Sequence, residues 1–287
     1  MYLPGSIVTV LSDTYGITIN EHRSVSGGSI NQAYFISTNK GRFFLKYNPS
    51  APDDFFDKEA LGLATLKSAE TSMRIPDVIA AGNPQEGIPA FLLLEYIEEG
   101  SSGNSLGFGA ELAKLHQTRN EYFGLDEDNY IGSLPQYNGQ YDDWISFFRE
   151  KRIEPQMKMA FNSGRLSKNL DANWNRLATE LENIIPPCKP SLLHGDLWGG
   201  NYLFDTAGTA VLIDPAVYYG HPEVDLSFTK MFGGFSEDFY RGYESVSPLE
   251  AGFEKRVPVF NMYPLLVHVN LFGGHYATQF ERFLRSF

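Results

Sequence analysis

The chain has 287 residues, of which 43% are hydrophobic and 20% charged, a composition that excludes a disordered, collagen-like or coiled-coil protein. At roughly 150 residues per domain, this length favours two lobes. The chain carries 23 Lys and Arg against 35 Asp and Glu, a net charge of −12. That charge argues against sequence-independent binding to the phosphates of nucleic acids.

The single cysteine and the N-terminal residues indicate the expected environment. Cys188 has no second cysteine to pair with, which excludes an internal disulfide or a thiolate zinc site, and we expect it to be structural. No Lys or Arg precedes Arg23, so the positive start of a secretory signal is missing. The longest apolar runs are too short to cross a bilayer. We therefore expect a cytoplasmic protein with no membrane span.

The first third of the chain predicts a small antiparallel sheet with one helix. Apolar patterns bounded by turn residues predict strands at 17–25, 33–38, 41–47, 75–80 and 90–96. Asn39, Lys40 and Gly41 separate the second and third of these strands and indicate a hairpin. Pro52 precedes a predicted helix at 53–67.

A polar, turn-rich segment at 98–103 predicts the link to a second lobe. Helical patterns dominate beyond it, at 106–115, 142–160 and 170–184, with two further helices expected within 253–284. We therefore expect an α+β protein, with a smaller lobe over residues 1–97 and a larger, mainly helical lobe over residues 98–287.

A lysine and a glutamate of the first lobe are predicted to form an ion pair. At 100° per residue, Glu59 falls within the apolar stripe that Phe55 and Leu63 define on the predicted helix. A carboxylate there needs a cation, and Lys46, at the end of an apolar strand, is the obvious partner. Kinases hold nucleotide phosphates with such a pair. Taken alone, Lys46 is better explained as a solvated lysine at a strand end, and Glu59 as a residue at a frayed edge of the helix.

A short glycine-containing segment separates the first two predicted strands. Its residues Gly27, Gly28 and Ser29 allow bare backbone to approach a ligand and to direct N–H groups at a phosphate. The segment matches neither a Walker A sequence nor a complete Gly-x-Gly-x-x-Gly motif. A plain hairpin turn is the alternative interpretation.

The most informative motif lies between two apolar strands of the second lobe. Asp196 and Asn201 are five positions apart on a polar loop, and Asp214 follows the next apolar strand. Phosphoryl transfer needs such a set: Asp196 to orient an acceptor hydroxyl and take its proton, Asn201 and Asp214 to bind Mg²⁺ through oxygen. The alternative is a turn in which the carboxylates only bind their own backbone.

Four segments of the second lobe resemble the fructosamine kinase (ketosamine-3-kinase) family, a branch of the aminoglycoside and choline kinase-like fold. They are His-Gly-Asp-Leu-Trp-Gly-Gly-Asn at 194–201, Asp-Pro-Ala at 214–216, Tyr-Gly-His-Pro-Glu at 219–223 and Met-Phe-Gly-Gly-Phe at 231–235. The resemblance covers nearly the whole chain and extends to Tyr-Ile-Gly-Ser at 130–133. It implies a bilobal protein-kinase-like fold that transfers the γ-phosphate of ATP to the 3-hydroxyl of a ketosamine. The phosphorylated adduct then decomposes and releases the amine.

The resemblance also implies residues that spacing alone does not reveal. They are the backbone at Glu95 and Ile97 for adenine, and Trp198, His268 and Asn270 for the sugar. Two further polar residues, His116 and Asp225, are expected to be structural, with Asp225 at a helix start where it can brace the catalytic loop.

Several questions of substrate stay open at this point. The acceptors are free ketosamines or glycated lysines of proteins, and the sugar is fructose, ribulose or erythrulose in origin. One alternative is a kinase of another small hydroxyl compound, such as an aminoglycoside or amino sugar. A second alternative is a non-catalytic nucleotide-binding module, although all three residues of the predicted phosphoryl-transfer set are present.

Overall fold

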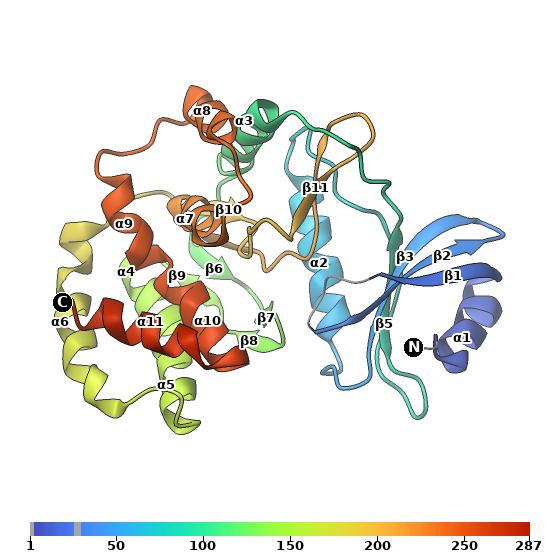
Figure 1. Ribbon diagram of the computed structural model, residues 1–287, viewed down its shortest axis with the longest axis horizontal. Coiled ribbons are helices and arrows are strands. Elements are labelled where there is room, and N and C mark those ends of the chain that lie inside the picture. The colour runs from blue at the N-terminus through green and yellow to red at the C-terminus, as the bar shows by residue number, and fades with distance from the viewer. Residues whose placement is uncertain (1–2, 26–29) are drawn as a thin grey trace. The chain divides into compact units, whose positions relative to one another are not determined.

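The computed structural model describes residues 3–25 and 30–287, and its chain divides into two compact units (Figure 1). The first unit comprises Met1–Ser68, Met73–Gly103 and Tyr202–Asp214. The second comprises Ala69–Ser72, Asn104–Asn201 and Pro215–Phe287. The sequence boundary was expected after residue 97, and Tyr202–Asp214 was expected in the larger part of the chain.

A five-stranded antiparallel sheet in the order β1-β2-β3-β5-β4 forms the first unit, as the sequence predicts. Its strands are β1 (Ile19–Val25), β2 (Gln32–Thr38), β3 (Gly41–Asn48), β4 (Val78–Gly82) and β5 (Ala90–Glu95). The strand expected at 75–80 begins later, at Val78, because Pro76 has no backbone N–H to donate to a neighbouring strand. The backbone of Arg74 pairs with another segment: its N–H donates to the Ala210 carbonyl at 2.9 Å.

Two helices lie on opposite faces of this sheet (Figure 1). Helix α2 (Phe55–Ser68) was predicted, whereas α1 (Gly5–Tyr15) was not, since it has no side-chain N-cap and its Ile7, Val8 and Val10 are β-branched residues, which favour strands. Ile7 and Leu11 of α1 are fully buried in a core with Leu45 of β3. Successive strand residues point to opposite faces, so the neighbouring Lys46 faces α2.

A hairpin from the C-terminal half of the chain belongs to the first unit. Its strands are β11 (Tyr202–Phe204) and β12 (Ala210–Leu212). Backbone bonds attach it at two places: Leu212 N–H donates to Arg74 O at 3.0 Å, and Gly100 N–H donates to Phe204 O at 2.8 Å. The hairpin ends just before Asp214, so these bonds position that residue within the first unit.

The second unit contains short strands that sequence periodicity does not reveal. A four-stranded sheet in the order β10-β13-β6-β9 uses β6 (Phe123–Leu125), β9 (Gly139–Tyr141), β10 (Ser191–Leu193) and β13 (Tyr218–Gly220). A separate hairpin joins β7 (Asn129–Ile131) to β8 (Leu134–Gln136). Each strand has three residues, which is too short for an alternating pattern to show.

Helices make up most of the second unit. They are α3 (Ser105–Leu115), α4 (Trp144–Phe147), the π-helix η1 (Phe148–Ile153), α5 (Glu154–Asn162), the 3₁₀ helix η2 (Lys168–Leu170), α6 (Asp171–Ile184), α7 (Glu223–Phe232), α8 (Glu237–Val246), α9 (Phe253–Phe260), α10 (Met262–Phe272) and α11 (His275–Leu284). Those predicted at 106–115 and 170–184 are confirmed. Within the part of the chain that the structure describes, no helix is both long and apolar enough to cross a membrane.

The prediction of two helices within 253–284 is wrong, because three occupy it. Asn261 separates α9 from α10. Gly273 and Gly274 both adopt positive φ angles, of 65° and 60°, and so end α10 before α11 begins. The helix expected over 142–160 is instead the succession of α4, η1 and α5.

Candidate active site

Lys46, Glu59 and Asp214 form a buried charged cluster in the first unit. The Lys46 ammonium lies 2.6 Å from Glu59 Oε1 and 2.5 Å from Asp214 Oδ1, and only 4% of the Lys46 side chain is exposed. The structure therefore brings Lys46 and Glu59 together, as the apolar stripe on α2 indicates. It also brings Asp214 to Lys46, a contact that the sequence analysis did not predict because the two residues are 168 positions apart.

The two carboxylates keep Lys46 charged. Burial alone lowers the pKa of Lys46, but the attraction of Asp214 and Glu59 outweighs it and raises that pKa above its ordinary value. Burial raises the pKa of Glu59, while the Lys46 ammonium opposes that rise. The cluster thus holds the Lys46 cation in a fixed position. The Asp214 side chain, one of its two carboxylates, is 45% exposed.

Asp214 has an unusual backbone conformation. Its φ of 53° makes it the one non-glycine residue with positive φ among those described. The left-handed region costs an L-residue about 1–2 kcal/mol, least for Asp and Asn. Such strain is concentrated at functional sites, and here it sets the direction of a carboxylate immediately after the β11–β12 hairpin.

Asp196 and Asn201 are held together in the second unit, on the loop after β10. The Asn201 side-chain amide donates to both the Asp196 carboxylate and the Asp196 carbonyl, each at 2.8 Å. Asn201 N–H donates to Trp198 O at 2.9 Å, which closes the loop. Because the amide nitrogen of Asn201 faces Asp196, its oxygen is the atom directed elsewhere, as a metal ligand requires.

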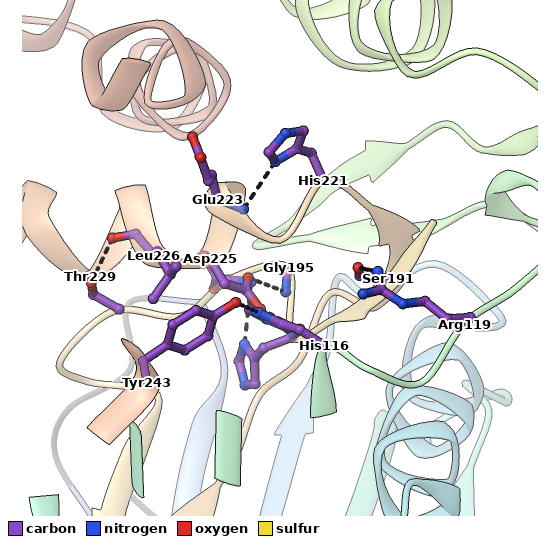
Figure 2. Close-up of polar contacts among 12 residues, drawn as sticks. His116, Arg119, Ser191, Gly195, His221, Glu223, Asp225, Leu226, Thr229 and Tyr243 are labelled. Carbon is purple, nitrogen blue, oxygen red and sulfur yellow. Dashed lines mark hydrogen bonds and ion pairs between the residues drawn. The ribbon is translucent and has the colours of Figure 1, made fainter. Parts of the chain in front are cut away.

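A buried network braces this loop from the side of α7 (Figure 2). Asp225 accepts the backbone N–H groups of His194 and Gly195, at 2.8 and 2.9 Å. It also lies 3.2 Å from His116 Nε2, and His116 Nδ1 lies 2.8 Å from the Tyr243 hydroxyl. A carboxylate only accepts, so His116 Nε2 carries the proton in this contact. Asp225 therefore fixes the two residues that precede Asp196.

Among the residues expected at the adenine, Glu95 closes strand β5 and Ile97 is buried. Glu95 N–H donates to Asp77 O at 2.8 Å, and its carboxylate pairs with Arg74, which also reaches Asp205 at 3.3 Å. Gly27, Gly28 and Ser29 lie outside the described residues.

Of the three residues expected at the sugar, two meet in one aromatic cluster of the second unit. Trp198 is 36% exposed and packs edge-to-face on Phe232, whose ring centroid is 4.9 Å from that of His268. Burial lowers the pKa of His268, and its Nδ1 bonds to Pro264 O at 2.7 Å. His268 is therefore neutral, with Nε2 as its acceptor.

The third residue, Asn270, is turned toward α5. It is buried, and its amide donates to the Gln156 carbonyl at 2.9 Å and to Gln156 Oε1 at 2.7 Å. Cys188 is partly buried, and burial raises the pKa of its thiol to about 12, which leaves it protonated and unreactive.

Solved structures define the class of the protein. The aminoglycoside phosphotransferase APH(4)-Ia, in a ternary complex with ADP and hygromycin B, aligns with a TM-score of 0.66 at 17% identity over 98% of each chain. A structure assigned as a fructosamine-3-kinase from Thermobifida fusca aligns with a TM-score of 0.85 at 30% identity, again over 98% of each chain. The fold is therefore that of the protein-kinase-like phosphotransferases.

Sequence comparisons identify the family. The fructosamine kinase family model matches residues 5–287. A protein of Enterococcus faecium assigned as a ketoamine kinase is 39% identical, over 98% of this chain and 99% of its own. The chloroplastic protein-ribulosamine 3-kinase of Arabidopsis thaliana is 38% identical, over 94% of this chain and 83% of its own. The chain belongs to the fructosamine kinase family, as the four motifs of the second lobe predict.

Proposed function

We propose that the protein is a ketosamine 3-kinase, which transfers the γ-phosphoryl group of ATP to the 3-hydroxyl of a sugar–amine adduct. The observation that carries this proposal is the Asp196 carboxylate, oriented by Asn201 on a loop that Asp225 braces, in a chain of the fructosamine kinase family. The ketoamine and ribulosamine kinases that resemble the chain over most of its length support the choice of acceptor.

Asp196 acts as the general base. Its carboxylate orients the 3-hydroxyl and accepts its proton while the sugar oxygen bonds to the γ-phosphorus and the bond to the leaving ADP breaks. Asn201 donates to the same carboxylate, which keeps one oxygen in place throughout. This role needs a carboxylate, since an amide at position 196 cannot take the proton.

Lys46 binds the nucleotide phosphates, with Glu59 holding the ammonium in position. Asn201 and Asp214 would be the protein's ligands for a magnesium ion, because each offers an oxygen donor and Mg²⁺ is bound in proteins by one or two such ligands together with substrate phosphates. When bound, the ion neutralises charge that develops on the phosphates. Backbone at Glu95 and Ile97 receives the adenine, and Gly27, Gly28 and Ser29 contribute backbone N–H groups to phosphate binding, as the sequence predicts.

The acceptor binds at the aromatic cluster. Trp198 offers an exposed indole face to the sugar, and the neutral His268 offers Nε2 to a sugar hydroxyl. Asn270 contributes to this site by holding α10, the helix that carries His268, against α5 through its bonds to Gln156. The exposure of Trp198 and Phe232 is compatible with free ketosamines and with glycated lysine side chains of proteins.

The reaction repairs amines, because the phosphorylated adduct decomposes and releases them. We place the protein in the cytoplasm. Its use of ATP supports this location, and so does its single cysteine, since a chain with one cysteine does not depend on an internal disulfide.

Acceptor-dependent release of ADP tests the proposal. The protein is incubated with Mg²⁺-ATP and, separately, with a ribulosamine, a fructosamine, an aminoglycoside or no acceptor. We expect ADP release only with the ketosamines. Release with the aminoglycoside alone would instead establish the alternative kinase, and tight ATP binding without turnover of any acceptor would indicate a binding module.

A further inference from the structure

The hairpin β7–β8 carries two buried amides side by side. Asn129 and Gln136 are directly opposed across its strands, and they are only 6% and 1% exposed. Gly132, with a φ of 58°, makes the turn that joins the strands. Buried side-chain amides cost free energy unless their hydrogen bonds are made, so their partners indicate why they are there.

Both amides bind the backbone that follows Asp214 in the chain. Asn129 donates to Val217 O at 2.9 Å. Gln136 donates to Ala216 O at 3.0 Å and to Asn129 Oδ1 at 2.8 Å. The Tyr263 hydroxyl donates to Gln136 Oε1 at 2.8 Å. If the Gln136 amide were flipped, its oxygen would face two acceptors, Ala216 O and Asn129 Oδ1, with no hydrogen between them. The hydrogen-bond partners therefore determine the orientation of this amide.

Ala216 in turn supports the loop that carries Asp196. Its N–H donates to His194 O at 2.9 Å. Gly195 adopts a φ of 82°, and a Cβ atom there would come within 2.0 Å of Ala216 O. The backbone of the loop therefore passes close to the same carbonyl that Gln136 holds, and it is bonded to the Ala216 N–H through His194.

Further buried groups keep the hairpin amides in place. Asn138 donates to Asn129 Oδ1 at 3.0 Å, and Arg152 donates to Asn138 Oδ1 at 2.8 Å. The Arg152 guanidinium lies 3.9 Å from the Tyr218 ring centroid and 5.3 Å from that of Tyr263. Tyr263 is thus held both by its packing on Arg152 and by its hydrogen bond to Gln136.

We propose that Gln136 and Tyr263 are positioning residues for phosphoryl transfer. Tyr263 orients the Gln136 amide, Gln136 holds the Ala216 carbonyl, and that carbonyl supports Gly195 beside the base. Asp225 binds the same loop through its N–H groups, so the two sets of contacts hold it at different atoms. This inference rests on the proposed function for its kinetic readout but not for its structural one.

The test compares two buried tyrosines that both stack on Arg152. Tyr263→Phe removes the hydroxyl that orients Gln136. Tyr218→Phe is the matched control, because no hydrogen bond joins the buried Tyr218 hydroxyl to Gln136 or Ala216 in the described part of the chain. Gln136→Met removes the contact to Ala216 itself. For each variant, kcat and KM for Mg²⁺-ATP are measured with a ketosamine, and amide hydrogen exchange is followed across the whole chain.

We expect kcat to fall about tenfold in Tyr263→Phe and about 100-fold in Gln136→Met, with KM for ATP within about twofold. The double variant should be no slower than Gln136→Met, since both act on one path. Exchange should rise locally, at 192–198 and 216–218, in Tyr263→Phe but not in Tyr218→Phe.

Equal kcat and equal local exchange in the two phenylalanine variants would overturn the inference, as would an increase in exchange spread over the whole second unit. If the unaltered protein phosphorylates no ketosamine, the proposed function fails. The exchange pattern then decides the inference by itself: a local rise in Tyr263→Phe supports it, and no change overturns it.

Discussion

The two units hold their functional residues by different means. In the first, Lys46 is surrounded by two carboxylates, and net attraction keeps it ionised although it is buried. In the second, the segment before Asp196 is held by hydrogen bonds: its N–H groups donate to the buried Asp225 carboxylate, and neutral amides hold the carbonyls next to it. A phosphate needs a fixed charge, whereas a general base needs a fixed position. The predictions below test that division.

Replacing the base should have the largest effect. In Asp196→Asn the amide still fits beside Asn201 but cannot accept a proton, so kcat should fall about 10³-fold. ATP affinity, measured by calorimetry, should change less than about threefold, since the nucleotide residues are untouched. Unchanged turnover would refute the role of Asp196.

Removing the charge of Asp225 should lower the stability of the folded protein. The Asp225 carboxylate now accepts hydrogen bonds from three donors. In Asp225→Asn the side-chain NH₂ group would face at least one of these donors, and that hydrogen bond would be lost. We expect the free energy of unfolding to fall by about 3 kcal/mol in urea. The control, Asp238→Asn, breaks an exposed pair with Arg241 and should cost under about 1 kcal/mol. Similar losses in both would contradict the bracing role.

Removing one carboxylate from the charged cluster of the first unit should weaken nucleotide binding. Glu59→Gln leaves Lys46 paired with Asp214 but removes the charge that holds it in place, so KM for Mg²⁺-ATP should rise about tenfold. Asp54→Asn, at an exposed carboxylate 3.7 Å from Lys58, is the matched control and should leave KM unchanged. An unchanged KM in Glu59→Gln would show that Asp214 alone positions Lys46.

A buried histidine of the second unit should make stability depend on pH. Burial lowers the pKa of His221 to about 3, against 6.5 when exposed. Between these values the unfolded chain binds a proton that the folded chain does not, so stability rises with pH and is lost as pH falls below about 6.5. The loss approaches about 1.4 kcal/mol per pH unit.

Urea unfolding from pH 7.5 to 4.5 measures this slope. His221→Asn keeps an acceptor for the Glu223 N–H and cannot titrate, so its slope should be smaller than that of the unaltered protein. Equal slopes would show that His221 is protonated while folded.

The difference between the units also explains what the sequence could predict. Lys46 and Glu59 are visible as charges at apolar positions, and the five strands of the first sheet are long enough to show their pattern. Asp196, Asn201 and Asp214 are visible by spacing and motif. The family follows from the four motifs of the second lobe.

The bracing contacts are not visible in this way. Gln136 and Asn129 lie on three-residue strands and are common surface residue types, so nothing in their neighbourhood indicates burial. His116 and Tyr243 meet Asp225 from far along the chain. Such contacts depend on tertiary packing, which periodicity does not encode.

The position of the phosphate on the product tests the central claim most directly. The product formed from ATP and a ribulosamine is examined by ³¹P and proton NMR as it forms, before it decomposes, with Asp196→Asn run in parallel. The account predicts one phosphate ester on the 3-oxygen from the unaltered protein and none from the variant. A phosphate on another hydroxyl, or an equal yield from the variant, would contradict it.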